Sequence, residues 1–316
     1  MVKYTYRGLV GEIIPRDAKV IIASLSCEFV QPRAFQQHPE IEQVIMTKNV
    51  KRIGRSAFAN CPKLLKVCLC RVTIIDECAF FACEAVREVV ANHVTHIKYA
   101  GFGWNEKLRR INLPSLIVAG DSSFMGCEML FEVQFGSPLQ KLKKQAFAYC
   151  LSLKYVTIPL KLDLLDNLNV FENVQLETVN LVKGSEIMNV ISALQCKRWK
   201  ADMLTTIDSI DIFLRAAFGY YRLYRYGVVE KPRLPYTHYG DCVTVVHSPS
   251  RCEASGFCID RWSRLLIRKI THYQDFHSDV IEMAGSVLMQ YLSREIVFES
   301  ILPYLSIPSH SLPDLL

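Results

Sequence analysis

Apolar and small residues recur every 22 to 24 positions through the first 185 residues, in the skeleton I-G-x-x-A-F-x-x-C-x-x-L-x-x-V. The stretch from Ile53 to Val67 holds this skeleton in full. Its phenylalanine has counterparts that number seven in all: Phe35, Phe58, Phe80, Phe102, Phe124, Phe147 and Phe171. A unit of this length cannot bury its own apolar face, so a sustained period predicts units stacked on one another.

The pattern within each copy predicts the shape of one coil. The residue before the phenylalanine is small in six of the seven copies, which predicts a tight turn between closely approaching coils. Six, nine and eleven positions later the residues are almost all aliphatic, an alternation typical of a short strand with one buried face. In the seventh copy these positions arrive one residue early, as Leu176, Val179 and Leu181. The sequence predicts an α/β solenoid over residues 1–185, with an N-terminal cap, about seven repeats and a parallel sheet lining one side.

Four cysteines share the position three residues after the phenylalanine, where His38 and Asn105 replace them in two other copies: Cys61, Cys83, Cys127 and Cys150. We expect a small, weakly polar side chain that faces the interior near backbone groups, which fits a buried reduced thiol. The alternative is disulfides between stacked coils, such as Cys61 with Cys83. Because the N-terminus does not resemble a secretory signal, we favour thiols.

Residues eight and ten positions after the phenylalanine are expected on the exposed face of the sheet, in two columns. The first column is Gln43, Lys66, Glu88, Arg110, Glu132 and Tyr155, and the second is Ile45, Cys68, Val90, Asn112, Gln134 and Thr157. Four charges of the first column alternate in sign from Lys66 to Glu132, which predicts a cross-strand ladder. The ladder could support stacking alone or could belong to a partner site. The candidate partner-binding face is Gln43, Lys66, Glu88, Arg110, Asn112, Glu132, Gln134, Tyr155 and Thr157.

A helical period replaces the repeat in residues 186–316. One apolar stripe runs from Ile187 to Leu214 and a second from Trp262 to Tyr291, with a Tyr-, Gly- and Pro-rich loop at about 219–260 between them. The prediction is a C-terminal helical hairpin. It could cap the open end of the solenoid or mediate a homodimer.

Charge and hydropathy narrow the classes of partner. The formal net charge is +6, and the basic residues are mostly interspersed with acidic ones. The one compact basic cluster, Lys141 to Lys144, is expected to be a solvated turn, with a phosphate contact as the alternative. No apolar run is long enough to span a bilayer. We therefore expect no nucleic-acid or membrane partner and a cytoplasmic or nuclear protein.

Catalytic and metal motifs are missing from the sequence. The loop contains His238, Cys242, His247, Cys252 and Cys258, but their spacing matches no zinc pattern. The run YYRLYRY could stack nucleobases, although packing of its tyrosines against the hairpin is the simpler interpretation. The sequence holds no Walker loop, no H-E-x-x-H and no G-x-S-x-G. No catalytic, cofactor-binding or metal-binding residue is assigned, and no enzymatic activity is expected.

The skeleton I-G-x-x-A-F-x-x-C-x-x-L-x-x-V resembles the signature of BspA-type leucine-rich repeats. The opening YRG…EIIPRDAKVIIASLSCEFVQPRAF and the post-repeat VNLVKG…ISALQCKRWKADMLTTIDSI are similar to intracellular members found in diatoms and related algae. This resemblance implies a leucine-rich-repeat fold and a protein-binding role, with no catalytic residues to carry over. We expect a non-enzymatic intracellular scaffold that binds a partner on its sheet face. The alternatives are a cell-surface adhesin, a subunit that presents substrates to an enzyme, and a metal-dependent or nucleic-acid-binding module.

Overall fold

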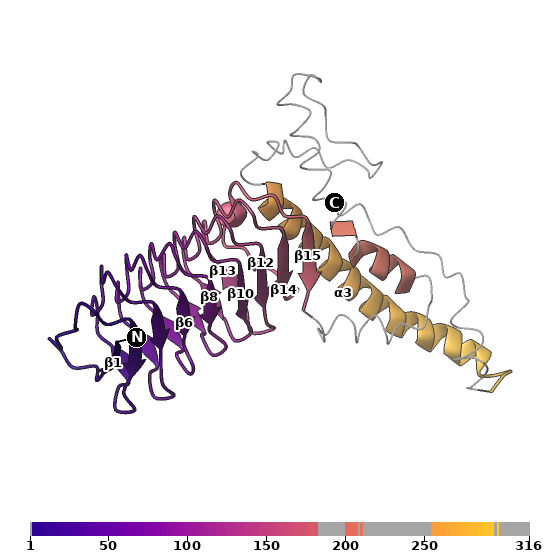
Figure 1. Ribbon diagram of the computed structural model, residues 1–316. Helices are drawn as coiled ribbons and strands as arrows, with labels where there is room; N and C mark the ends of the chain where they lie inside the picture. The colour runs from indigo at the N-terminus through magenta and orange to yellow at the C-terminus, as the bar shows by residue number, and fades with distance from the viewer. Residues whose placement is uncertain (1, 183–199, 208, 211–253, 294–295, 297–316) are drawn as a thin grey trace, which may run out of the picture. The chain divides into compact units, whose positions relative to one another are not determined.

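The computed structural model describes residues 2–182, 200–207, 209–210, 254–293 and 296. The chain divides into two compact units. The first unit comprises Met1–Val182 together with Pro249–Asp260, and the second comprises Lys183–Ser248 together with Arg261–Leu316. Figure 1 shows the regular coils of the first unit.

Parallel strands line one side of the first unit, one strand per coil, as predicted. Five of them form a sheet in the order β1 (Lys3–Tyr6), β2 (Val20–Ala23), β4 (Gln43–Ile45), β6 (Lys66–Cys68) and β8 (Glu88–Val90). Four more form a second sheet: β10 (Arg110–Leu113), β12 (Glu132–Phe135), β14 (Tyr155–Ile158) and β15 (Thr178–Leu181). The strand of the seventh copy is β15, whose Val179 pairs with Val156 of β14. The one-residue shift of that copy is therefore confirmed.

A further parallel sheet of six two-residue strands runs along the coils. Its members are β3 (Phe29–Val30), β5 (Arg52–Ile53), β7 (Ile74–Ile75), β9 (His96–Ile97), β11 (Val118–Ala119) and β13 (Lys141–Leu142). This sheet was not predicted from the sequence, although its buried residues always lie five positions before the phenylalanine, as Ile53 does before Phe58. Lys141, the first residue of the basic cluster, begins β13 and donates to the carbonyl of Asp163 at 2.7 Å.

The repeated phenylalanines form a continuous aromatic stack inside the solenoid. Centroids of successive rings lie 4.7 to 5.7 Å apart from Phe35 to Phe171, and the first five pairs are parallel within 8°. At the N-terminal end Tyr6 meets Phe35 edge-on at 4.9 Å, which ends the stack. All of these rings are at most 1% exposed. The predicted apolar spine is confirmed.

Turns on either side of the first six phenylalanines of the spine bend sharply by using left-handed backbone. In the second copy these residues are Ser56, with φ of 53°, and Asn60, with φ of 59°. The equivalent residues of the third copy, Cys78 and Ala82, do the same. Positive φ is unfavourable for residues with a Cβ, by about 1–2 kcal/mol. Stacking against neighbouring coils therefore holds these turns in place.

The cysteine position has a specific hydrogen-bonding role. Each thiol donates to the carbonyl oxygen of the phenylalanine one coil earlier: Cys61 to Phe35, Cys83 to Phe58, Cys127 to Phe102 and Cys150 to Phe124, at 3.0 to 3.3 Å. Asn105 replaces the thiol with its amide, which donates to Phe80 at 3.0 Å and to Phe102 at 2.7 Å. The cysteines of the described residues are free. The predicted buried thiol is thus confirmed, and the disulfide alternative is not formed.

The last coil of the first unit is covered by the beginning of helix α3 (Ala254–Leu288). Ser255 is buried and donates to the carbonyl of Val174 at 2.9 Å. A Cβ added at Gly256 would lie 2.1 Å from the carbonyl oxygen of Leu168, so glycine permits this close approach. The predicted loop at about 219–260 is wrong at its end, because packing of Ser255, Gly256 and Ile259 makes residues 254–260 helical.

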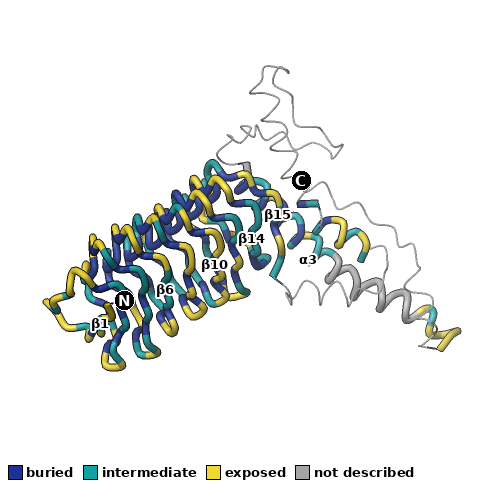
Figure 2. Tube along the Cα trace, in the orientation of Figure 1, coloured by how far each residue is buried: buried dark blue, intermediate teal, exposed yellow. Residues whose placement is uncertain are grey.

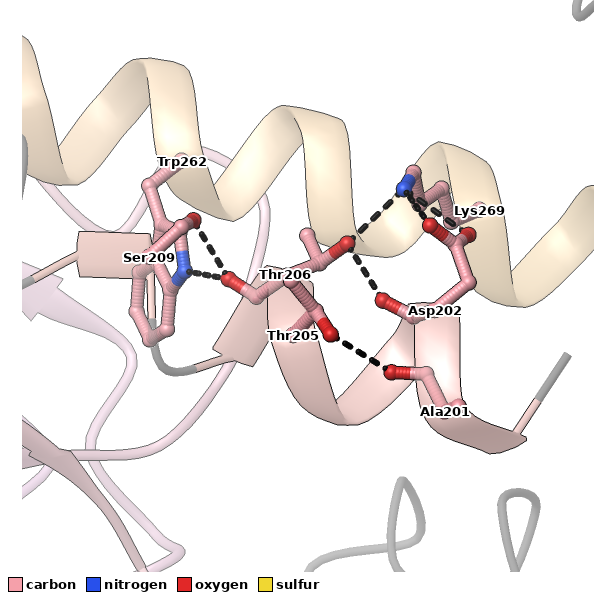
Figure 3. Close-up of polar contacts among 7 residues, drawn as sticks. All are labelled: Ala201, Asp202, Thr205, Thr206, Ser209, Trp262 and Lys269. Carbon is pink, nitrogen blue, oxygen red and sulfur yellow. Dashed lines mark hydrogen bonds and ion pairs between the residues drawn. The ribbon is translucent and has the colours of Figure 1, made fainter. Parts of the chain in front are cut away.

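The second unit contains a polar and aromatic junction between two helical segments (Figure 3). The indole nitrogen of Trp262 in α3 donates to the carbonyl of Thr206 at 2.9 Å. About two helical turns after Trp262 in α3, Lys269 donates to both carboxylate oxygens of Asp202 at 2.9 Å and to the Thr206 hydroxyl at 2.8 Å. Since higher numbers in α3 meet lower numbers in 200–207, the two segments are antiparallel at this junction. The connection between them lies outside the described residues.

The predicted apolar stripes agree with the junction only in part. Met203, Ile210, Trp262 and Leu266 are buried as expected. Val287 is 55% exposed, and Tyr291, at 81% exposure, lies beyond the end of α3. The stripe therefore fails at its C-terminal end, where no described element covers it. Ile187 and Leu214, the ends of the first stripe, lie outside the described residues.

Candidate protein-interaction face

The nine predicted partner-binding residues lie on the strands of the long sheets, and none of them is buried. Register pairs them across neighbouring coils as expected. In the first column Gln43 pairs with Lys66 and Lys66 with Glu88, and further on Arg110 pairs with Glu132 and Glu132 with Tyr155. Parallel strands lie about 4.8 Å apart, so each column is a row of neighbouring side chains.

The predicted charge ladder forms as two separate ion pairs and is wrong as a continuous row of four. Lys66 pairs with Glu88 at 2.7 Å, and Arg110 pairs with Glu132 at 3.4 Å. Between these pairs the sheet is interrupted, because β8 ends one sheet and β10 begins the next. In the part of the chain that the structure describes, no ion pair joins Glu88 to Arg110.

The second column changes polarity at the same interruption. On the N-terminal side its neighbours are apolar: Ile22, Ile45, Cys68 and Val90. On the C-terminal side they are polar: Asn112, Gln134, Thr157 and Asn180. All eight are exposed or half-buried, and Val90 is 38% exposed. Figure 2 shows this mixture of half-buried and exposed positions along the strands.

Local contacts hold side chains in place on the polar half of the face, which comprises β10, β12, β14 and β15. Gln134 donates to the Glu132 carboxylate at 2.6 Å, so Glu132 holds both an amide and the Arg110 guanidinium. Tyr155 meets the edge of the Phe131 ring at 5.0 Å between centroids. These contacts orient side chains that remain accessible, a geometry suited to a partner with hydrogen-bonding groups.

Two titratable side chains on the N-terminal side of the interruption, Lys66 and Cys68, have raised pKa values. The hydrogen bond to Glu88 raises the pKa of Lys66, which keeps that amine charged. Burial raises the pKa of the Cys68 thiol, with a smaller opposing effect from Lys66. A thiol held protonated is a poor nucleophile, so Cys68 acts here as a small apolar side chain.

A buried carboxylate, Asp76, directly follows β7 of the six-stranded sheet. Asp76 accepts from Arg52 Nε at 2.6 Å and Nη2 at 2.9 Å, and its Oδ1 lies 2.9 Å from Lys98 Nζ. Its side chain is 5% exposed. Burial acts to raise the pKa of Asp76, but hydrogen bonds from Arg52 and Lys98 outweigh it and lower the pKa. The cluster ties three successive coils together.

An open depression of about 500 Å³ lies beside this cluster, lined by His96, Lys98, Tyr99 and Lys143 among others. Gly120 forms part of its wall, where an added Cβ would lie 2.7 Å from the carbonyl oxygen of Ile97. None of these lining residues belongs to a site predicted from the sequence. Asp76 and Lys98 share the position four residues before the phenylalanine, and this pair of opposite charges in successive copies could have indicated it.

The loop residues weighed as zinc ligands fall mostly outside the described residues, where His238, Cys242, His247 and Cys252 lie. Cys258 is half-buried in the first turns of α3. Over the described ranges, no three His, Cys, Asp or Glu residues are grouped to hold a metal ion. Within those same ranges no helix has the length and hydropathy needed to cross a bilayer.

Comparison with known proteins identifies the repeat. A family model described as "BspA type Leucine rich repeat region" matches in six copies over residues 18–87 and 73–200. Together these ranges span residues 18–200, or 183 of 316 residues, which is more than half of the chain. No curated protein matches the chain significantly.

Several solved structures of bacterial repeat proteins are similar. A leucine-rich-repeat protein of T. pallidum is 21% identical with a TM-score of 0.43, covering 49% of this chain and 72% of that one. A leucine-rich-repeat protein of Bacteroides ovatus is 25% identical with a TM-score of 0.38, covering 46% of this chain and 48% of its own. A leucine-rich cell surface protein of Faecalibacterium prausnitzii is 15% identical with a TM-score of 0.31. The match covers 57% of this chain and 65% of that one.

Proposed function

Because the chain belongs to the BspA-type leucine-rich-repeat family, we propose that it is a non-enzymatic scaffold that binds another protein on the exposed face of its long sheets. Repeat solenoids present extended surfaces of this kind for macromolecular recognition. The family favours a protein-interaction or adhesin-like role. The polarity of the exposed face favours a protein over a nucleic acid as the partner.

The polarity change of the second column is the observation that carries this proposal. Ile45, Cys68 and Val90 offer an apolar row, while Asn112 and Gln134 continue the same row with hydrogen-bonding groups. Protein interfaces combine an apolar area with polar surroundings in this way. Nucleic acid fits the face poorly, because its cations Lys66 and Arg110 are already paired with carboxylates.

The buried thiols support an intracellular location. Cys61, Cys83, Cys127 and Cys150 each use their S–H group to satisfy a backbone carbonyl. Oxidation would remove that donor and leave a buried carbonyl unsatisfied, so a reducing compartment suits this core. The adhesin remains the alternative for an oxidising location. A subunit that presents substrates to an enzyme would use the same face.

Affinity purification of the full chain from its native cell, with quantitative mass spectrometry, tests the proposal. The variant Val90→Asp with Arg110→Glu changes the face at two exposed residues. Lys144→Glu is the matched control, since Lys144 is exposed and follows β13 of the six-stranded sheet, away from the candidate face in sequence and strand order. We expect a protein that co-purifies with wild type and control and is lost with the double variant. Retention of every partner by the double variant would overturn the proposal.

A homodimer through the C-terminal helices is a separate proposal. Its support is the exposure of Val287 and Tyr291, two members of the predicted stripe. Light scattering on wild type and on Val287→Ser with Tyr291→Ser decides it. We expect the variant to lower the measured mass to that of one chain, and a monomeric wild type would contradict a dimer.

A further inference from the structure

The second residue after each phenylalanine of the spine has left-handed backbone. In all seven copies its φ lies between 53° and 75°. Bulky side chains are strained in this conformation, whereas glycine and asparagine adopt it more readily. Five copies have glycine, alanine or an amide side chain there, and two have a large aromatic ring. The seven residues are Gln37, Asn60, Ala82, Trp104, Gly126, Tyr149 and Asn173.

The two aromatic residues of this row are exposed as well as strained. Trp104 is 37% exposed and Tyr149 is 42% exposed, and each has φ of 59°. Packing of the core does not account for rings that remain in contact with water. Backbone strain of this kind is concentrated at functional positions such as ligand-contact sites. The pair therefore indicates a contact surface.

The two rings belong to one hydrogen-bonded row of coils. Backbone N–H groups of Trp104, Gly126 and Tyr149 each donate to the next coil, at 2.7, 2.9 and 2.9 Å. The Trp104 ring lies on Gly126, where an added Cβ would be 2.8 Å from the nearest ring atom. The Tyr149 hydroxyl reaches the Glu172 carboxylate, also one coil further on, at 3.5 Å. Both side chains therefore lean toward the following coil, and their turns are two coils apart.

The indole N–H of Trp104 is left without a hydrogen-bond partner among the described residues. The indole N–H of Trp262, in contrast, donates to the carbonyl of Thr206. An exposed tryptophan offers a ligand both an apolar ring face and a donor. The Trp104 side chain can therefore contact an apolar group and a carbonyl oxygen of the same ligand.

Charged residues near these turns are mostly acidic. Along the chain, three carboxylates and one cation lie within three residues of the row in the fourth to seventh copies: Glu106, Glu128, Glu172 and Lys107. Lys143 and Lys144 precede the spine phenylalanine of their coil, whereas Tyr149 follows it. The surroundings of the rings therefore disfavour a phosphate backbone and favour a partner with cationic side chains.

The separation of the two turns matches the repeat of a polyproline II helix. Neighbouring coils are about 4.8 Å apart, so two coils span about 9.6 Å. A polyproline II helix has three residues per turn and rises about 3.1 Å per residue, or about 9.3 Å per turn. Prolines three residues apart can therefore meet Trp104 and Tyr149 together. Such a helix has no internal hydrogen bonds, so one of its carbonyl groups can accept from the Trp104 indole.

We propose that Trp104 and Tyr149 form a docking site for a proline-rich segment of another protein, in polyproline II conformation and with basic residues beside its prolines. Proteins bind such segments on aromatic surfaces, and the preformed ligand helix lowers the entropic cost of binding. Glu128, which is exposed, attracts the basic residues. The site shares no residue with the candidate partner-binding face, so each can fail a test without the other.

Fluorescence polarisation of labelled peptides with the purified full chain tests this inference. The probes are a decaproline peptide with arginines at both ends and a peptide with glycine and serine in place of the prolines. We expect the proline peptide to bind at least about tenfold more tightly. Trp104→Asn with Tyr149→Asn should weaken its binding by more than about tenfold, because both rings are removed. Glu128→Gln should weaken it less and should lower its sensitivity to salt.

Asparagine is the replacement because Asn60 and Asn173 form the same turn in other copies. Tyr149→Asn alone keeps the Trp104 ring on Gly126, and it should still weaken binding if the double variant melts below wild type. Tyr99→Asn is the matched control, since Tyr99 is an aromatic residue with 55% exposure that precedes the spine phenylalanine of its coil. It should bind the proline peptide like wild type.

Three results would overturn the inference. The first is wild type that binds neither peptide or both equally. The second is equal binding of the proline peptide by wild type and by Tyr149→Asn. The third is wild type that ignores both peptides but binds cellohexaose through the same rings, which would assign the site to a glycan.

Discussion

The thiol of Cys83 donates a hydrogen bond to the carbonyl oxygen of Phe58, one coil earlier, at 3.0 Å. The ring of Phe58 also stacks on Phe80, which belongs to the same coil as Cys83, with 5.1 Å between the ring centroids. Each coil is therefore joined to the previous one by a ring and by a polar contact beside it. A side chain at the cysteine position must be small enough to be buried and must also donate.

Exchanging donors tests this requirement. Asn105 leaves its Oδ1 buried without a hydrogen-bond partner in the described residues. Asn105→Cys should stabilise the protein by about 1 kcal/mol, since a thiol can still reach Phe80 while the unsatisfied oxygen disappears. Cys83→Asn should destabilise it by a similar amount for the converse reason. Chemical denaturation monitored by circular dichroism measures both, and equal stability of the two variants would contradict the role of the thiol.

Thiol reactivity should separate the cysteines by position. Burial raises the pKa of Cys83 and of Cys150 well above the usual value, and a neighbouring thiol acts in the same direction. The thiolate is the reactive form, so these two should resist alkylation by iodoacetamide in native protein at pH 8. Cys70 is exposed and should be modified first. Peptide mass spectrometry after timed labelling gives the order, and unfolded protein, in which all should react, is the control.

The spine and the strands of the long sheets were predictable because a fixed period places equivalent residues above one another. Phe58 and Phe80 could be assigned to one stack from spacing alone. Ile53 and its counterparts recur five residues before the phenylalanine, but a strand of two residues is too short to show the alternation that identifies a strand. The start of α3 was missed because the loop was predicted from a Tyr-, Gly- and Pro-rich stretch, and the close contact of Gly256 with Leu168 has no counterpart in the sequence pattern. The nine residues of the candidate face lie on strands and none of them is buried, as their spacing predicts, but no residue signals the interruption between β8 and β10.

The interruption predicts which charges are coupled. Arg110→Glu should lower the free energy of unfolding by a few tenths of a kcal/mol, because it replaces the ion pair with Glu132 by two neighbouring carboxylates on an exposed surface. Adding Glu132→Arg should restore the lost stability. Adding Glu88→Arg instead should not, since Glu88 belongs to the other sheet. A double-mutant cycle on melting temperatures measures both couplings, and equal rescue by the two second changes would show a continuous ladder.

Acid should weaken the contact between coils at Asp76. The pKa of this carboxyl is lowered on folding, because Arg52 and Lys98 outweigh the effect of burial. Its contribution to stability is therefore full above the unfolded pKa of about 3.9 and is lost as pH falls through the lower folded pKa. Asp76→Asn should destabilise the protein by about 1–3 kcal/mol at pH 7, and the difference from wild type should shrink toward pH 2. Urea unfolding at several pH values measures it, and a difference that grows in acid would reverse the assigned sign.

The contact between helix α3 and the last coil can be tested at Gly256. A methyl group there would lie 2.1 Å from the Leu168 carbonyl oxygen, and backbone cannot yield as a flexible side chain can. Gly256→Ala should therefore lower stability by about 1–3 kcal/mol, or by roughly 2–4 °C in melting temperature for each kcal/mol. Gly103→Ala is the matched control, because its added Cβ would meet only the Phe81 ring at 3.4 Å and Ala100 at 3.5 Å. If α3 covers the last coil, Gly256→Ala should also speed exchange of backbone amides in β15, while Gly103→Ala should not. Unchanged melting and unchanged exchange in Gly256→Ala would show that the helix does not close this end of the solenoid.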